Sequence, residues 1–132
     1  MKTANKKIPI DVQEKANVFL KDFNNKTFAK NSGVEYYAEY RGAFLYLNRI
    51  EDKKDGPIAR LKYNGEFTNW DFAIYKWSRE KYDPDEDFFP GFECLNGTIE
   101  GALVAGNKAY PPRWTPPISG FQSFFKQIFG KL

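Results

Sequence analysis

Four strand-like runs that follow one another closely constrain the fold of this chain more than any other feature. Each run is rich in β-branched and aromatic residues, which favour strands. The runs are Val34–Tyr40, Ala43–Ile50, Pro57–Asn64 and Trp70–Trp77. The segments between them have two to six residues, which is too short for the crossover that a parallel neighbour requires. The sequence therefore predicts an antiparallel meander of four strands.

A helix is predicted ahead of the meander, from about Val12 to Phe23. Asp11, followed three residues later by Glu14, is typical of a capping box at a helix start. Apolar residues recur at helical spacing and form one stripe. The stripe consists of Ala16, Phe19, Leu20 and Phe23.

A second helix is predicted after the strands, beginning at Asn96-Gly97-Thr98 and ending near Ala109, before Pro111-Pro112. Helix, four strands and helix in this order predict an α+β fold, in which a sheet carries its helices on one face. We expect a single domain over residues 8–110. Its core is expected to contain Phe19, Phe23, Leu45 or Phe44, Leu61, Ile74 and Leu103.

The run YRGAFLYLNRI, followed by GPIARLKYNGEFTNWDFAIYKWS, resembles small, uncharacterised bacterial domains of unknown function with an α-β4-α pattern. Those domains share a Tyr/Gly hairpin, an Ala-Arg-x-x-Tyr strand, and a strand in which Trp, hydrophobic residues and Tyr alternate. The similarity extends from about Asp11 to Pro111. The resemblance implies the fold class, and it implies no activity and no site residues.

The residue types present limit the chemistry that is available. The chain contains no histidine and one cysteine, Cys94, which excludes His-based nucleophile systems, an intramolecular disulfide and a Cys-rich zinc site. The acidic run Asp83–Asp87 begins like a calcium loop, but Phe88 and Cys94 stand where such a loop needs Gly and Glu. We expect no metal and no cofactor, and a non-catalytic protein. An enzyme that uses carboxylate, Tyr or Lys chemistry is the second alternative.

A candidate binding surface follows from strand alternation. If Phe72 and Ile74 face the helices, Tyr75 and Trp77 face away from them, because alternate residues of a strand share a face. On the neighbouring strand Arg60 and Lys62 lie on that same outward face. Aromatic rings beside cations suit the binding of a base, a ring or a peptide. A covering helix or a second subunit is the other interpretation.

The C-terminal segment is predicted to be an amphipathic helix over residues 118–132, after a Pro-rich linker over residues 111–117. Its apolar stripe consists of Phe121, Phe124, Phe125, Ile128, Phe129 and Leu132. Such a short helix needs a surface on which to fold. We predict that it mediates self-association or binds a protein partner, while docking on its own domain is the alternative. No segment is long and apolar enough to span a membrane.

These observations predict a small cytoplasmic binding or regulatory module. The cytoplasm is expected from the lone thiol and the lack of a signal-peptide core. Charge is segregated: residues 79–100 carry seven acids and two bases, whereas residues 101–132 carry four bases and no acid. A nucleic-acid-binding domain is the first alternative, and steep weakening of binding by salt would distinguish it.

Overall fold

The computed structural model describes residues 7–86 and 88–112. Within them the chain forms an α+β fold with two α-helices, one short 3₁₀ helix and a five-stranded antiparallel sheet. The predicted fold class is therefore confirmed, with one more strand than expected. In chain order the elements are α1 (Ile10–Thr27), β1 (Val34–Arg41), β2 (Phe44–Glu51), β3 (Lys54–Glu66), β4 (Asn69–Lys76), β5 (Lys81–Asp83), η1 (Phe92–Cys94) and α2 (Ile99–Ala109).

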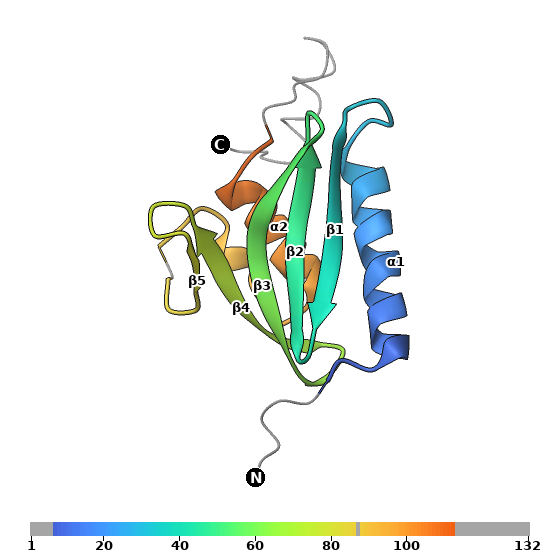
Figure 1. Ribbon diagram of the computed structural model, residues 1–132, viewed down its shortest axis with the longest axis vertical. Coiled ribbons are helices and arrows are strands. Elements are labelled where there is room, and N and C mark those ends of the chain that lie inside the picture. The colour runs from blue at the N-terminus through green and yellow to red at the C-terminus, as the bar shows by residue number, and fades with distance from the viewer. Residues whose placement is uncertain (1–6, 87, 113–132) are drawn as a thin grey trace.

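The sheet is a meander in which every strand pairs with its neighbour in the sequence (Figure 1). The sequence predicts four strands, so the fifth strand corrects that number. Glu80 adopts a left-handed backbone with φ 54°, and the chain reverses there so that Tyr82 pairs with Tyr75. Three residues of β5 are enough to extend the sheet, although their polar composition gives no strand pattern.

A bulge shapes the centre of the sheet. Leu47 pairs with Ala59 and Asn48 pairs with Pro57, so Ile58 is an extra residue in β3. Both Ile58 and Ala59 are buried, and the bulge thus directs two consecutive side chains inward. Beyond the bulge β3 continues to Lys54, three residues further than the predicted start at Pro57.

Helix α1 carries the predicted stripe, with Ala16 and Leu20 buried and Phe19 and Phe23 packed against the core. The predicted capping box is wrong, because the residue at the N-cap is Pro9 and no side chain caps the helix. Helix α1 also continues to Thr27 through the two asparagines that follow Phe23. Tertiary contacts of those residues override their weak helix propensity.

One of these asparagines, Asn24, pairs with the edge of the sheet. Its side-chain Oδ1 accepts from the Tyr36 backbone N–H at 2.9 Å, and its Nδ2 donates to the Tyr36 carbonyl, also at 2.9 Å. β1 is an edge strand, so these two backbone groups have no neighbouring strand. The amide of Asn24 therefore takes the place of a strand partner at this position.

Helix α2 begins as predicted, with the Thr98 hydroxyl accepting from the Gly101 N–H at 3.0 Å. It lies close against the bulge of β3. A Cβ on Gly106 would come within 2.7 Å of Ile58 Cγ2, so glycine is required for this approach. Trp70 also donates its backbone N–H to the Gly97 carbonyl at 2.8 Å, which ties the start of α2 to β4.

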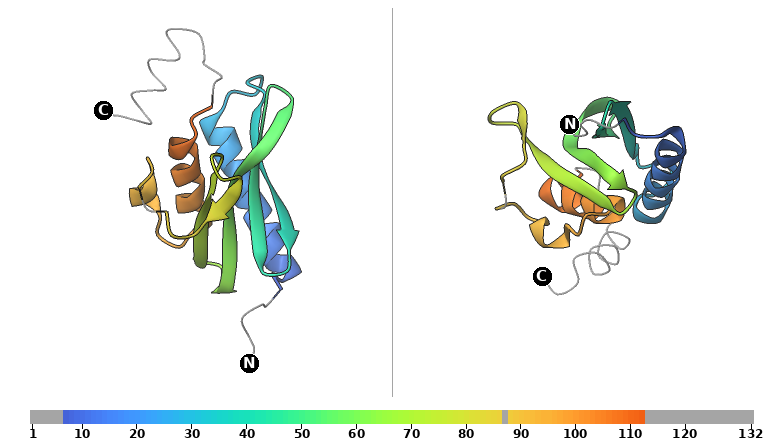
Figure 2. Two further views of the ribbon diagram at one scale, coloured as in Figure 1. Left: turned by 60° about the vertical axis from the view of Figure 1, so that its left-hand side comes forward. Right: turned by 90° about the horizontal axis from the view of Figure 1, so that it is seen from below.

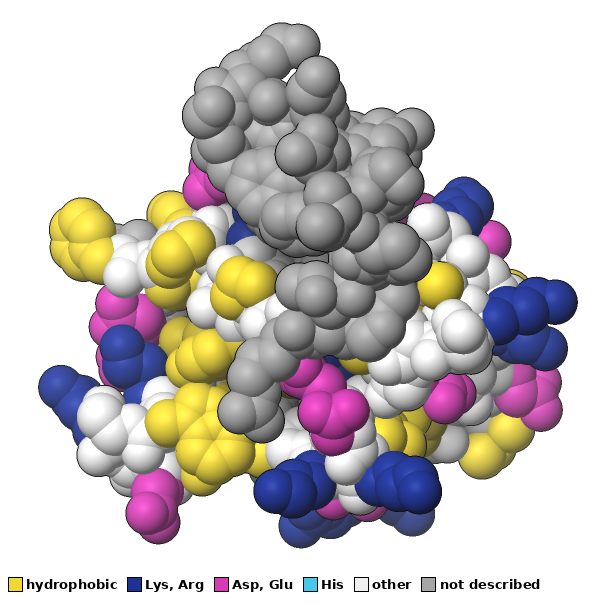
Figure 3. All heavy atoms as spheres, turned by 90° about the horizontal axis from the view of Figure 1, so that it is seen from above, with side chains coloured by type: hydrophobic (Ala, Val, Ile, Leu, Met, Phe, Trp, Pro, Cys, Tyr) yellow, Lys and Arg dark blue, Asp and Glu magenta, His cyan; other side chains and the backbone are white. Residues whose placement is uncertain are grey.

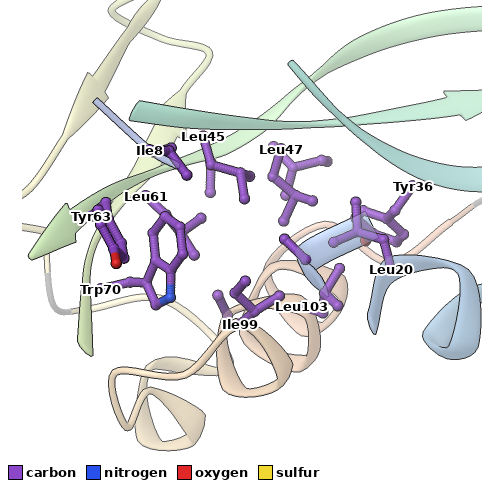
Figure 4. Close-up of a cluster of buried hydrophobic side chains, with 14 of the residues drawn as sticks. Ile8, Leu20, Tyr36, Leu45, Leu47, Leu61, Tyr63, Trp70, Ile99 and Leu103 are labelled. Carbon is purple, nitrogen blue, oxygen red and sulfur yellow. The ribbon is translucent and has the colours of Figure 1, made fainter. Parts of the chain in front are cut away.

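The main core lies between the sheet and both helices, which cover the same face (Figures 2 and 4). Leu45, Leu61 and Leu103 belong to it as predicted, and Ile74 is also buried. Phe19 and Phe23 are only partly buried, and the alternative Phe44 lies on the opposite side of β2 from Leu45. The predicted core is thus largely confirmed, and Leu45 is the correct member of the pair.

The predicted domain over residues 8–110 coincides with these elements and stays a prediction. Of the predicted linker, Pro111 and Pro112 are described and lie in neither helix nor strand. The remainder of that linker and the predicted helix over residues 118–132 lie outside the described residues.

Candidate functional site

The candidate site is the face of the sheet that points away from α1 and α2, here called the outer face. Strand register brings Tyr46, Arg60 and Ala73 into one row across β2, β3 and β4. Phe44, Lys62 and Asp71 form the next row. The predicted residues Arg60, Lys62, Tyr75 and Trp77 alternate with the buried positions Leu61 and Ile74, which is the arrangement expected for a shared outer face.

A continuous group of side chains occupies the middle of this face. We call it the aromatic–arginine cluster. It consists of Arg41, Phe44, Tyr46, Arg60, Tyr75, Trp77 and Tyr82.

Two guanidinium groups lie over aromatic rings in this cluster. The Arg60 Cζ is 4.6 Å from the Phe44 ring centroid and 5.4 Å from that of Tyr82. The Arg41 Cζ is 4.6 Å from the Tyr46 ring centroid. Contact with a ring face uses the flat side of a guanidinium, while its N–H groups point outward in the plane. These arginines are held in place and keep hydrogen-bond donors available.

The rings of the cluster contact one another edge to face. Tyr46 and Tyr82 have centroids 5.5 Å apart, Tyr82 and Tyr75 are 5.0 Å apart, and Tyr75 and Trp77 are 5.1 Å apart. Each of these four rings therefore has at least one other ring as a neighbour. Trp77 ends the series and is 55% exposed, so it offers the largest free aromatic surface.

The charges of the cluster are unbalanced. In the part of the chain that the structure describes, Arg41, Arg60 and Lys62 have no carboxylate within ion-pair distance. Some cations elsewhere do have such partners, as Arg79 pairs with Asp83 and Lys76 pairs with Glu86. Glu39 and Asp71 also lie on the outer face, in the rows of Arg60 and Lys62, so this face carries both signs of charge. Its two guanidinium groups remain free of ion pairs in the described residues and could bind an external carboxylate or phosphate.

Burial in the cluster affects one titratable group. The pKa of Tyr82 is raised, first by burial and then by the neighbouring Tyr46 and Tyr75, while Arg60 and Arg41 act in the opposite direction. Its phenol therefore stays protonated at neutral pH and remains a hydrogen-bond donor.

Four members of the cluster were not predicted as binding residues from the sequence: Arg41, Phe44, Tyr46 and Tyr82. Tyr82 falls outside the four predicted strands, and Phe44 was considered as a core residue. A signal for Tyr46 was present, because it alternates with Leu45 and Leu47. Arg41 flanks a two-residue turn, and its position over Tyr46 depends on the hairpin register.

A second polar group lies inside the molecule between the sheet and α2. The Tyr36 hydroxyl donates to Asn107 Oδ1 at 2.8 Å and accepts from Arg49 Nη1 at 3.1 Å. Arg49 also pairs with Glu51 at 3.2 Å and donates to the Tyr110 carbonyl. Burial is the main cause that raises the pKa of Tyr36 to about 12. These groups satisfy one another, so we assign them to stability.

A groove with a volume of about 620 Å³ lies between α1 and β1. Tyr36 and Tyr37 line this groove, but their hydroxyls form hydrogen bonds with residues outside it. The Tyr36 hydroxyl contacts Asn107 on α2, and the Tyr37 hydroxyl donates to Asp55 on β3 at 2.6 Å. Lys21, Lys30 and Glu35 also line the groove, and we assign no role to it.

The acidic segment after β5 shows local interactions. Asp83 Oδ1 accepts from the Asp85 backbone N–H at 2.9 Å, and its other oxygen pairs with Arg79. Glu86 pairs with Lys76 at 3.3 Å. Within residues 7–86 and 88–112, no three His, Cys, Asp or Glu side chains gather as metal ligands would.

Comparison with protein-family models, with curated proteins and with solved structures finds no match. The resemblance to bacterial domains of unknown function therefore stays a prediction. Across the described helices, none has the length and apolar character needed to cross a membrane. The predicted partner helix, with Phe121, Phe124, Phe125, Ile128, Phe129 and Leu132, lies outside the described residues.

Proposed function

We propose that this protein is a non-catalytic binding domain whose outer face recognises an acidic, partly apolar segment of another protein. The observation that carries this proposal is the pair Arg41 and Arg60, whose guanidiniums lie on rings and have no carboxylate partner in the described part. A carboxylate can engage two N–H groups of such a guanidinium at once. An acidic side chain of a partner would supply the missing charge.

The residue types of the cluster support a protein partner. Tyr, Trp and Arg are the side chains most enriched among residues that dominate binding energy at protein interfaces. Trp77, with more than half of its surface exposed, provides an apolar anchor beside the cations. An acidic segment that also carries a large apolar side chain would complement both features.

The same surface suits a single-stranded nucleic acid less well. Stacking of bases requires free ring faces, whereas Tyr46, Tyr75 and Tyr82 already contact other rings. The whole chain carries 20 basic and 17 acidic side chains, for a net charge of only +3. Such a balance lacks the broad positive field that attracts a polyanion.

Selection from a display library of random twelve-residue peptides tests the proposal. We expect enrichment of peptides that combine Asp or Glu with a large apolar residue. For a selected peptide, Arg60→Ala should weaken binding by about 10- to 100-fold, since a hydrogen-bonded charge pair contributes roughly 1.5–3 kcal/mol. Arg60→Lys should also weaken it, because lysine keeps the charge but loses the two-point contact.

Arg79→Ala is the matched control, because Arg79 is exposed and pairs with Asp83 away from the outer face. It should leave the affinity for the peptide unchanged. A twenty-nucleotide oligo(dT) strand is measured in parallel across a salt series. Tighter binding of the oligonucleotide than of any peptide, with steep loss at high salt, would contradict a protein partner and support the nucleic-acid alternative.

A further inference from the structure

A second exposed apolar surface lies on the side of the molecule that carries η1 and α2. Few large hydrophobic side chains are exposed in the described part, and three of them come from this region. Phe88 is 91% exposed, Phe92 is 43% exposed and Val104 is 37% exposed. Seen from above, apolar side chains gather on the side where β5 and η1 lie (Figure 3). We call Phe88, Phe92 and Val104 the back patch.

The protein holds the back patch in place. A Cβ on Gly91, which has φ +100°, would lie 2.5 Å from the Ala105 carbonyl oxygen and 3.0 Å from Lys108 Cβ. The turn before η1 therefore packs directly on the C-terminal half of α2. Lys108 Nζ also pairs with Glu93 Oε2 at 3.3 Å. These contacts fix Phe92 beside the helix that carries Val104.

Aromatic contacts fix the ring of Phe92 from the other side. Phe92 meets Phe89 edge to face at 5.8 Å, and Phe89 stacks on Phe72 of β4, also at 5.8 Å. Phe92 is thus anchored to the sheet through Phe89 while nearly half of its own surface faces water. A rigid, exposed apolar side chain of this kind is typical of a docking surface.

We propose that the back patch is the docking surface for the chain's own C-terminal segment, residues 118–132, folded as an amphipathic helix. The six apolar residues of that segment recur at helical spacing and require an apolar surface. The charges are complementary. The segment carries Lys126, Lys131 and no acid, whereas the exposed Glu100 lies one helical turn before Val104 on α2 and Glu93 directly follows Phe92.

The connection to α2 allows docking within one molecule. Helix α2 ends at Ala109, and Pro112 is the last described residue. The five residues 113–117 let the chain extend by roughly 20 Å before residue 118. A helix over residues 121–132 is about 18 Å long. A tethered segment also experiences an effective concentration on the order of mM, so at micromolar protein it favours its own domain over a second copy.

Cys94 provides a probe next to the patch, because it is the only cysteine of the chain, is half-buried and directly follows Glu93. A nitroxide attached to Cys94 broadens the amide signals of nuclei close to it. In the full chain we expect loss of the signals of residues 121–129 relative to the reduced nitroxide. The same loss should persist on dilution, because the contact is intramolecular.

Two substitutions make the experiment specific. Phe92→Asp places a charge in the back patch and should restore the signals of residues 121–129. Val18→Asp changes an exposed apolar residue of α1 and should leave them broadened. If Phe92→Asp alters the sheet signals, Val104→Asp replaces it, with the same expected recovery.

The proposal is overturned if the signals of residues 121–129 stay sharp in the labelled full chain. It is also overturned if they broaden only when an isotope-labelled chain without nitroxide is mixed with a nitroxide-labelled chain. That second outcome would instead support the self-association predicted from the sequence.

Discussion

At Asn24 a single side-chain amide replaces a missing strand, since it pairs with both backbone groups of Tyr36. Asn24→Ala leaves these two groups without their partner. We expect the free energy of unfolding to fall by about 1–3 kcal/mol, the cost of leaving such groups unsatisfied. Urea denaturation measures this change.

The neighbouring residue provides the control for this prediction. Asn25 is exposed, so Asn25→Ala changes helix propensity by the same amount and removes no contact with β1. It should stabilise the protein slightly, because alanine favours helix more than asparagine does. Equal effects of the two substitutions would show that the pairing with Tyr36 contributes nothing.

Three tyrosines of β1 make stability sensitive to alkaline pH. The pKa is raised from 10.0 to about 12 for Tyr36 and Tyr40, mainly by burial, and for Tyr37, mainly by its hydrogen bond to Asp55. The unfolded chain loses these protons first. The stability that they contribute is therefore fully present below pH 10 and is lost as the pH rises through 12.

Tyr36→Phe tests this linkage, because it removes one of the three phenols and keeps the ring. Its free energy of unfolding should lie below that of the unchanged protein at pH 8, since Arg49 and Asn107 lose a hydrogen-bond partner. The difference in free energy of unfolding between Tyr36→Phe and the unchanged protein should become smaller between pH 10 and pH 12. Denaturant midpoints of both proteins are measured across this pH range. A parallel decline of the two would contradict the contribution of the Tyr36 phenol.

The backbone of the turn between β2 and β3 affects the stability of the whole hairpin. Asp52 and Lys53 both have a left-handed backbone, with φ 56° and φ 66°, and this geometry favours Asn-Gly in a two-residue turn. Lys53→Gly should raise the free energy of unfolding by about 1 kcal/mol. Lys54→Gly is the control, because Lys54 lies within β3 and glycine there should lower it. Thermal unfolding distinguishes the two directions.

The approach of α2 to the sheet gives a coupled prediction. Gly106→Ala should destabilise the protein by about 1–3 kcal/mol, since its Cβ would press against Ile58 Cγ2. Ile58→Ala removes that methyl group. In its background Gly106→Ala should cost nothing or even stabilise the protein, because alanine is the better helix former. Additive effects in the double-mutant cycle would show that the two residues do not compete for space.

Elements with a strong pattern could be predicted from the sequence, and elements that depend on pairing could not. β4 is rich in aromatic and aliphatic residues, and Thr98 caps the start of α2, so both signals are local. β5 consists of Lys81, Tyr82 and Asp83, which carry no such signal, and only pairing with β4 makes them a strand. The helix start at Pro9 rather than Asp11 likewise depends on how the chain enters beside the β1–β2 turn, where the Ile8 N–H donates to the Gly42 carbonyl.

For the molecule as a whole, stability and binding are expected to reside on opposite faces of the sheet. Leu103 is fully buried under the inner face, so Leu103→Ala should cost about 2–5 kcal/mol. Trp77 is more than half exposed, so Trp77→Ala should cost less than Leu103→Ala, because much less apolar surface leaves the protein interior. Urea denaturation measures the loss in free energy of unfolding for each of the two variants. A larger loss for Trp77→Ala would make it an ordinary core residue.

The outer face could be predicted from alternation alone, whereas its interactions could not. Sequence spacing is enough to place Arg60 opposite Leu61, because the period of a strand is two residues. The contacts of Arg60 with Phe44 and Tyr82 join three strands, so they depend on the register of two pairings. Within the described residues Arg41 and Arg60 have no ion-pair partner. This too depends on the assembled surface, and no local sequence motif predicts it.

The pairing of Asn24 with Tyr36 also has a consequence for growth of the sheet by addition of further chains. In a cross-β polymer each incoming chain needs an edge with free backbone donors and acceptors. Within the described part, the Asn24 side chain occupies the backbone N–H and carbonyl of Tyr36 on one edge, so an incoming strand cannot pair there. On the other edge the three-residue β5 covers the end of β4, and Trp70 near the start of β4 donates its backbone N–H to the Gly97 carbonyl. The folded molecule is thus a poor seed for fibre growth, and an Asn24 variant would be expected to shorten the lag time of aggregation.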